Sequence, residues 1–99
     1  MKIDAGREIL KFNPVGAHNS GLDVSSVATL AIPAGADKLM LQAITQNCRY
    51  TLDGTAATTS VGFQLKAADP PRVVYVGSDA VIKVIEEAGT AVLQYQFGK

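Results

Sequence analysis

From residue 25 to the end of the chain, apolar and polar residues alternate in short runs that are separated by turn residues. In the run 38–45, for example, Leu39, Leu41 and Ala43 share one face, and Met40 and Ile44 lie on the other. Alternation with a period of two is typical of β-strands. The runs that follow this pattern are 25–32, 38–45, 48–52, 61–65, 72–76, 80–85 and 91–97. Short strands at this spacing predict an all-β fold.

Two of these runs carry specific expectations. The run 80–85 could also be drawn as a helix, but its four β-branched residues between 81 and 85 are costly in a helix and favourable in a strand. In the run 61–65 the alternation predicts that Val61, Phe63 and Leu65 face the core. The overall prediction is a single antiparallel β-sandwich or jelly-roll-like barrel of about 7–8 short strands.

Residues 1–24 have a different pattern. Ile9, Leu10 and Phe12 form a small apolar cluster, and residues 13–21 have the composition of a loop throughout. Two interpretations remain open: a first edge strand followed by a loop, or an extended arm that docks on a neighbouring subunit. We therefore divide the chain into an N-terminal segment, 1–24, and a β-sandwich domain, 25–99.

Composition narrows the class of partner. The chain has 99 residues, 47% of them hydrophobic, which fits one globular domain. Charged residues make up 18%, with nine basic and nine acidic side chains and no run of one sign. Nucleic-acid binding is not expected without a basic patch. A membrane span is not expected either, because no apolar stretch is long enough. A surface with few charges suits close packing against other subunits.

The sequence contains few residues that could act in catalysis or bind a metal ion. Cys48 and His18 are the only cysteine and histidine, thirty positions apart in a predicted strand and a predicted loop. Cys48 is interpreted as a small buried hydrophobe and His18 as a solvated loop residue. Glu86 and Glu87 are adjacent, so in a strand they would point to opposite faces, and in a turn they would be a solvated pair. We expect no catalytic residue, no metal and no cofactor. The lone cysteine and an N-terminus without an apolar leader segment indicate a protein made in the cytoplasm.

The stretch between residues 47 and 65 contains an Asp-Gly pair and a run of small hydroxyl residues between two predicted strands. Asp53-Gly54 resembles the start of a calcium loop, but threonine and alanine stand where further carboxylates are required. The pair fits a strand connection in which glycine takes a positive φ and aspartate bonds the nearby backbone. Tyr50, Tyr75 and Tyr95 could form a stacking platform for bases or sugars, although alternation places Tyr50 and Tyr95 with the apolar set.

The same stretch resembles a small domain found in virion proteins of tailed bacteriophages. The resemblance covers about residues 28–97. The matching positions are Pro33 to Ala36, Asn47, Arg49, Tyr50, Asp53 to Thr55, Thr58, Gly62, Leu65 and Gly89 to Leu93. It implies a β-sandwich virion component and carries no active site with it.

With this resemblance, the sequence favours a phage structural protein, most specifically a capsid decoration or cement protein on the capsid surface of the virion. Its expected partners are the major capsid protein lattice and further copies of itself, as a homotrimer. The candidate interface residues are Ile9, Leu10, Phe12 and Arg49. The alternative is a head- or tail-fibre module that contacts carbohydrate or a receptor on the host surface. A small enzyme is the third class, and no constellation of residues supports it.

Overall fold

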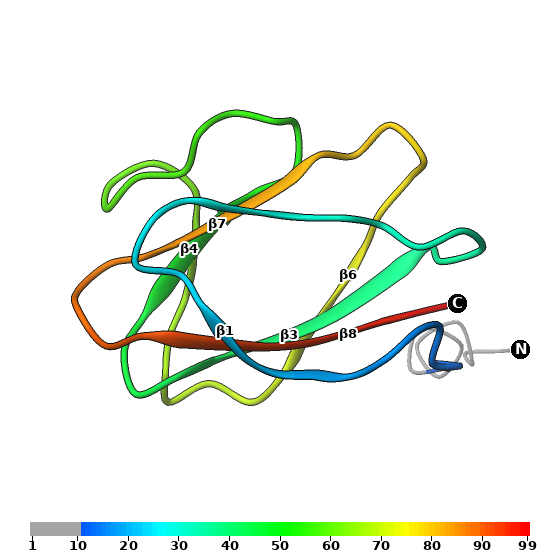
Figure 1. Ribbon diagram of the computed structural model, residues 1–99, viewed down its shortest axis with the longest axis horizontal. Helices are drawn as coiled ribbons and strands as arrows, with labels where there is room; N and C mark the ends of the chain where they lie inside the picture. Colours follow the sequence, from blue (N-terminus) through cyan, green and yellow to red (C-terminus); the bar gives the residue numbers. More distant parts are fainter. Residues whose placement is uncertain (1–10) are drawn as a thin grey trace, which may run out of the picture.

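The computed structural model describes residues 11–99, which form two packed antiparallel β-sheets (Figure 1). Ile9 and Leu10 lie outside these residues. The described chain contains eight strands and no helix. The strands are β1 (Asn19–Asp23), β2 (Ala28–Leu30), β3 (Lys38–Ile44), β4 (Cys48–Thr51), β5 (Phe63–Leu65), β6 (Arg72–Tyr75), β7 (Ile82–Glu86) and β8 (Val92–Gly98).

The strand order is that of a jelly roll. The first sheet has the order β1-β8-β3-β6 and the second the order β2-β7-β4-β5. Strand β1 pairs with β8, β2 with β7, β3 with β6 and β4 with β5. The four pairs follow one another along a single long antiparallel hairpin. The hairpin folds over on itself, so that successive strand pairs belong alternately to the first and to the second sheet. The prediction of an all-β, antiparallel single domain is confirmed, and of the two alternatives the structure is the sandwich, with the strand order of a jelly roll.

The core lies between the two sheets and follows the alternation of the strands. On β3, Leu39, Leu41 and Ala43 are buried, as the pattern predicted, while Met40 and Ile44 are half-buried on the outer face. Strand β3 lies between β8 and β6, so it is a central strand of the first sheet and not one at its edge. The largest fully buried side chains are Leu39, Leu41, Leu65, Ile82, Leu93, Val24, Val84 and Cys48.

The segment that could be drawn as a helix is a strand. Strand β7 pairs with β2 on one side and with β4 on the other. Its inward residues Ile82 and Val84 are 0% and 1% exposed. The β-branched residues that are costly in a helix pack well on a pleated sheet, and this preference agrees with the observed strand.

The first strand begins within the segment 13–21, which we predicted to be a loop. Strand β1 begins at Asn19 and forms the edge of the first sheet, with a bulge between Asn19 and Leu22. Leu22 stands opposite Leu93 of β8, and Val24, which follows the strand, is fully buried. Polar and glycine residues make this segment look like a loop locally, but ladder pairing with β8 overrides that local preference. Figure 1 shows the preceding residues beside the C-terminal end of β8, where Pro14 forms a bridge with Gly98.

Strand β5 departs from the expected pattern. Leu65 is buried, but Phe63 is 62% and Val61 is 42% exposed. Phe63 stands opposite Tyr50 of β4 and therefore has the inward orientation that alternation predicts. However, β5 is the edge of its sheet. The expectation that Val61 and Phe63 belong to the core was wrong, because a period of two fixes the side on which a residue lies and not whether another layer covers it.

Candidate functional site

The connection between β4 and β5 begins with a turn that the sequence predicted. Oδ1 of Asp53 accepts a hydrogen bond of 3.0 Å from the Thr55 amide. Gly54 has a φ of 88°, a conformation that glycine adopts without steric cost. Its amide donates to the carbonyl of Val81 at 3.0 Å, which ties the turn to the segment before β7. The turn interpretation of Asp53-Gly54 is confirmed.

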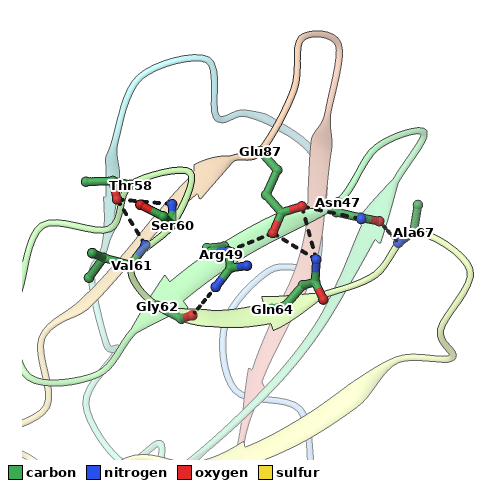
Figure 2. A network of polar contacts seen from close by, with 9 residues as sticks. All are labelled: Asn47, Arg49, Thr58, Ser60, Val61, Gly62, Gln64, Ala67 and Glu87. Atoms are coloured by element: carbon green, nitrogen blue, oxygen red, sulfur yellow. Dashed lines mark hydrogen bonds and ion pairs between the residues drawn. The ribbon is translucent and has the colours of Figure 1, made fainter.

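The connection ends in a second turn held by Thr58. Its Oγ1 accepts hydrogen bonds from the amides of Ser60 at 3.2 Å and Val61 at 3.0 Å (Figure 2). Gly62 follows with a φ of 123°, and a Cβ at this position would lie 3.0 Å from the carbonyl oxygen of Tyr50. Only glycine therefore allows the chain to pass this close to β4.

On the outside of the second sheet, three polar side chains converge on the carboxylate of a fourth residue, Glu87 (Figure 2). We call Asn47, Arg49, Gln64 and Glu87 the polar clasp. Nε of Arg49 donates to Oε2 of Glu87 at 2.6 Å. Nε2 of Gln64 lies 2.9 Å and 3.1 Å from the two Glu87 oxygens. Nδ2 of Asn47 donates to Oε1 of Glu87 at 3.4 Å. The clasp joins β4, β5 and the turn between β7 and β8.

Two members of the polar clasp also hold the backbone. Nη1 of Arg49 donates to the carbonyl of Gly62 at 3.0 Å. Oδ1 of Asn47 accepts from the amide of Ala67 at 2.9 Å, and the Asn47 carbonyl accepts from the amide of Glu87. These bonds tie the backbone on both sides of β5 to β4 and the adjacent Asn47, at Gly62 before the strand and at Ala67 after it.

The electrostatics of the clasp favour an ionised Glu87. Partial burial raises the pKa of this carboxyl, but hydrogen bonds from Arg49, Gln64 and Asn47 and the charge of Arg49 outweigh that effect, so its pKa is lowered from 4.5. The side chains of Arg49 and Glu87 are 25% and 18% exposed. The sequence-based interpretation of Glu87 as a solvated charge was wrong, because its partners come from β4 and β5, far away in the sequence.

A groove runs beside this hairpin, and we call it the β4–β5 groove. It has a volume of about 550 Å³. Its exposed apolar side chains are Val61 and Phe63. The centroid of the Phe63 ring lies 5.6 Å from the centroid of the Tyr50 ring. The full lining is Thr51, Leu52, Asp53, Thr55, Val61, Gly62 and Phe63. The groove combines a hydrogen-bonded backbone with apolar groups that no part of residues 11–99 covers.

The two candidate interface residues that lie within the described residues, Phe12 and Arg49, are in different parts of the fold. Arg49 belongs to the polar clasp and is engaged within the chain. Phe12 is half-buried near Gly98, where an added Cβ would lie 2.6 Å from the Phe12 ring. Ile9 and Leu10 lie outside the described residues. A contact role for these four residues stays a prediction.

The three tyrosines form no common surface. Tyr50 is 4% exposed, Tyr95 packs partly against the core and Tyr75 is 56% exposed on the opposite sheet from Tyr50. The hydroxyl of Tyr50 accepts a hydrogen bond of 3.0 Å from Nη1 of Arg72. The prediction that Tyr50 belongs to the core is confirmed, and a stacking platform of all three rings does not form.

The remaining reactive side chains are placed as the sequence indicated. Cys48 is fully buried, and burial together with the charges of Glu86 and Glu87 raises the pKa of its thiol to about 11. His18 is exposed, and its Nε2 is 2.9 Å from Oε1 of Gln94.

Residues 11–99 contain no cluster of three or more side chains suited to a metal ion. The same residues include no helix capable of crossing a bilayer.

Sequence reasoning missed both the polar clasp and the β4–β5 groove. The sequence singled out Asn47 and Gly62 only as positions of the resemblance, and Arg49 also as a candidate interface residue. In the structure each of the three has a role in holding the hairpin. The exposure of Phe63 follows from its place in a three-residue strand at the edge of the second sheet, which the sequence pattern does not reveal. No family model, curated protein or solved structure matches the chain.

Proposed function

We propose that this chain is a structural protein of a bacteriophage virion, a capsid decoration or cement protein that assembles as a homotrimer on the outer face of the capsid lattice. The proposal starts from the resemblance over residues 28–97. That resemblance implies a β-sandwich, and the chain has this fold. Jelly-roll sandwiches are common among viral capsid domains, which is an analogy at the level of the fold.

The observation that carries the proposal is the exposure of Phe63 and Val61 in the β4–β5 groove. Large apolar side chains at 62% and 42% exposure favour burial against another protein, and the polar clasp cross-links the surrounding hairpin by hydrogen bonds and an ion pair. A preorganised apolar contact loses little conformational entropy on binding. We assign the β4–β5 groove as the surface that contacts the capsid lattice.

The low charge of the chain fits attachment to a repeating lattice. The nine basic and nine acidic residues cancel, so long-range repulsion between neighbouring copies is small. A weak contact that is repeated over a shell gains by multivalency, provided that several copies are linked. A trimer that engages three lattice sites would meet this condition.

Co-sedimentation tests the proposal. The purified protein is mixed with phage capsids that lack tails, and its saturation ratio to the major capsid protein is measured. We expect saturable binding of hundreds of copies per capsid and a trimer in analytical ultracentrifugation. Absence of co-sedimentation at near-stoichiometric concentration would refute a decoration role. Saturation at only three, six or twelve copies would place the protein at a vertex or a tail instead.

A further inference from the structure

A second groove lies on the outer face of the first sheet, and we call it the glutamine groove. It has a volume of about 310 Å³. Its floor is formed by the central strands β3 and β8, and its walls come from the segment before β1 and from the connection between β5 and β6. The lining residues are Phe12, Pro14, His18, Met40, Leu41, Gln42, Pro71, Gln94, Tyr95 and Gln96.

The floor presents side-chain amides because of the register between the two central strands. Gln42 of β3 stands opposite Gln94 of β8, and Met40 stands opposite Gln96. Leu41 and Leu93 point into the core, so these four residues point outward by alternation. Directly opposed side chains on one face lie about 5 Å apart. The side-chain amides of the three glutamines and the thioether of Met40 therefore lie next to one another on the outer face of the first sheet.

Hydrogen bonds hold two of these amides in place and determine what they can offer. Oε1 of Gln94 is bonded to Nε2 of His18 at 2.9 Å, which leaves the Gln94 amide nitrogen as a donor. Nε2 of Gln96 donates to backbone carbonyls, at 3.1 Å to Gly16 and 2.9 Å to Phe97, which leaves its Oε1 as an acceptor. The side-chain amide of Gln42 can both donate and accept a hydrogen bond. Donors and acceptors are thus mixed within one small area.

The charge of the groove limits the class of ligand. Its described lining contains no Asp, Glu, Lys or Arg. A charged ligand would lose hydration there without gaining an ionic partner. Phe12, Pro14, Pro71 and Met40 supply apolar surface beside the amides. The ligand that fits is neutral and has hydroxyl-like groups on its edge and an apolar face.

We propose that the glutamine groove binds a neutral saccharide, with sugar hydroxyls on Gln42, Gln94 and Gln96 and the C–H face of the pyranose ring against Phe12. Each hydroxyl can both donate and accept, which matches the mixed amide groups. The volume of about 310 Å³ lies at the lower end of small-ligand sites and suits one or a few sugar units.

An extended peptide fits this groove less well. Peptides that bind sheets add to an edge strand and pair with its main-chain groups. The floor strand β3 is already paired with β6 and β8, and β8 is already paired with β1 and β3. Recognition must therefore come from the side-chain amides. The inference does not depend on the proposed function, because it concerns the opposite sheet from the β4–β5 groove.

Nuclear magnetic resonance on the isolated, ¹⁵N-labelled chain tests the inference. The probes are the methyl glycosides of glucose, galactose and mannose and free N-acetylglucosamine, each titrated to tens of millimolar. We expect at least one of them to shift the side-chain amide signals of Gln42, Gln94 and Gln96 in a saturable way. If none of these sugars shifts the three signals, or if only a proline-rich peptide does, the inference is overturned.

A matched pair of variants locates the site. Gln42→Ala removes an amide from the floor of the groove, and Gln46→Ala removes an exposed amide from the turn after β3. Loss of one or two hydrogen bonds is expected to weaken saccharide binding about tenfold in Gln42→Ala. Gln46→Ala should bind as the wild type does. Equal binding by Gln42→Ala and the wild type would contradict the proposed site. Neither outcome bears on capsid binding, which is measured separately.

Discussion

Nε of Arg49 lies 2.6 Å from Oε2 of Glu87, and this ion pair ties β4 to the turn between β7 and β8. The same guanidinium reaches the carbonyl of Gly62 through Nη1. One side chain therefore joins the two strands of the β4–β5 hairpin to the turn beyond β7. The shape of the β4–β5 groove depends on this arrangement, because Gly62 and its neighbour Phe63 line the groove.

The polar clasp predicts a dependence of stability on pH. The folded-state pKa of Glu87 is lowered below 4.5, so the clasp contributes fully above that pH and its contribution is lost as the pH falls through the lowered value. Glu87→Gln removes the ionisable group. Urea unfolding from neutral pH down to the acid range should therefore show a smaller loss of stability in Glu87→Gln than in the wild type.

Glu86→Gln is the matched control, since it removes a neighbouring carboxylate outside the clasp. Aspartates of the chain also titrate in the acid range, and the comparison between variants cancels their effect. The same acid-induced loss of stability in the wild type and in Glu87→Gln would show that the clasp does not stabilise the fold through the Glu87 charge.

Gly62→Ala is expected to destabilise the fold. Its φ of 123° is strained for any residue with a Cβ, and that Cβ would lie 3.0 Å from the Tyr50 oxygen. The expected loss in the free energy of unfolding is about 2–3 kcal/mol. Gly35→Ala is the control, since its φ is also positive, at 87°, but nothing lies within 4 Å of the added Cβ. Its cost should be about 1 kcal/mol. Denaturant unfolding measures both, and equal losses would contradict the close approach of Gly62 to β4.

Cys48 should resist alkylation in the folded protein. The thiol is fully buried, and its pKa is raised to about 11, so little thiolate is accessible to a reagent. Iodoacetamide at neutral pH should modify it slowly, and the rate should rise through the urea unfolding transition. Rapid, complete modification of the protein with an unchanged circular dichroism spectrum would contradict the placement of Cys48.

The period-two pattern identified most strands because each has one face in the core. It predicted the buried face of β3, and the β-branched run predicted β7 as a strand. It failed where long-range pairing decides the outcome. Strand β1 has the local composition of a loop, and its pairing with β8 is invisible from neighbouring residues.

The candidate site could be predicted only in part. Asp53-Gly54 was interpretable because a turn is a local feature. The partners of Glu87 come from residues 47, 49 and 64, which only the folded sheet brings together. The exposure of Phe63 depends on where the facing sheet ends, and the alternation of residues carries no information about that.

The central claim is that the β4–β5 groove binds the capsid lattice, and binding of a Phe63→Ala variant to tail-free capsids tests it most directly. Tyr75→Ala is the matched control, because Tyr75 is a comparably exposed aromatic residue on the opposite sheet. Loss of a central apolar contact of about 2 kcal/mol corresponds to roughly thirtyfold weaker binding. We predict this loss for Phe63→Ala and wild-type binding for Tyr75→Ala. Equal binding by Phe63→Ala and the wild type, with both proteins folded, would contradict the account.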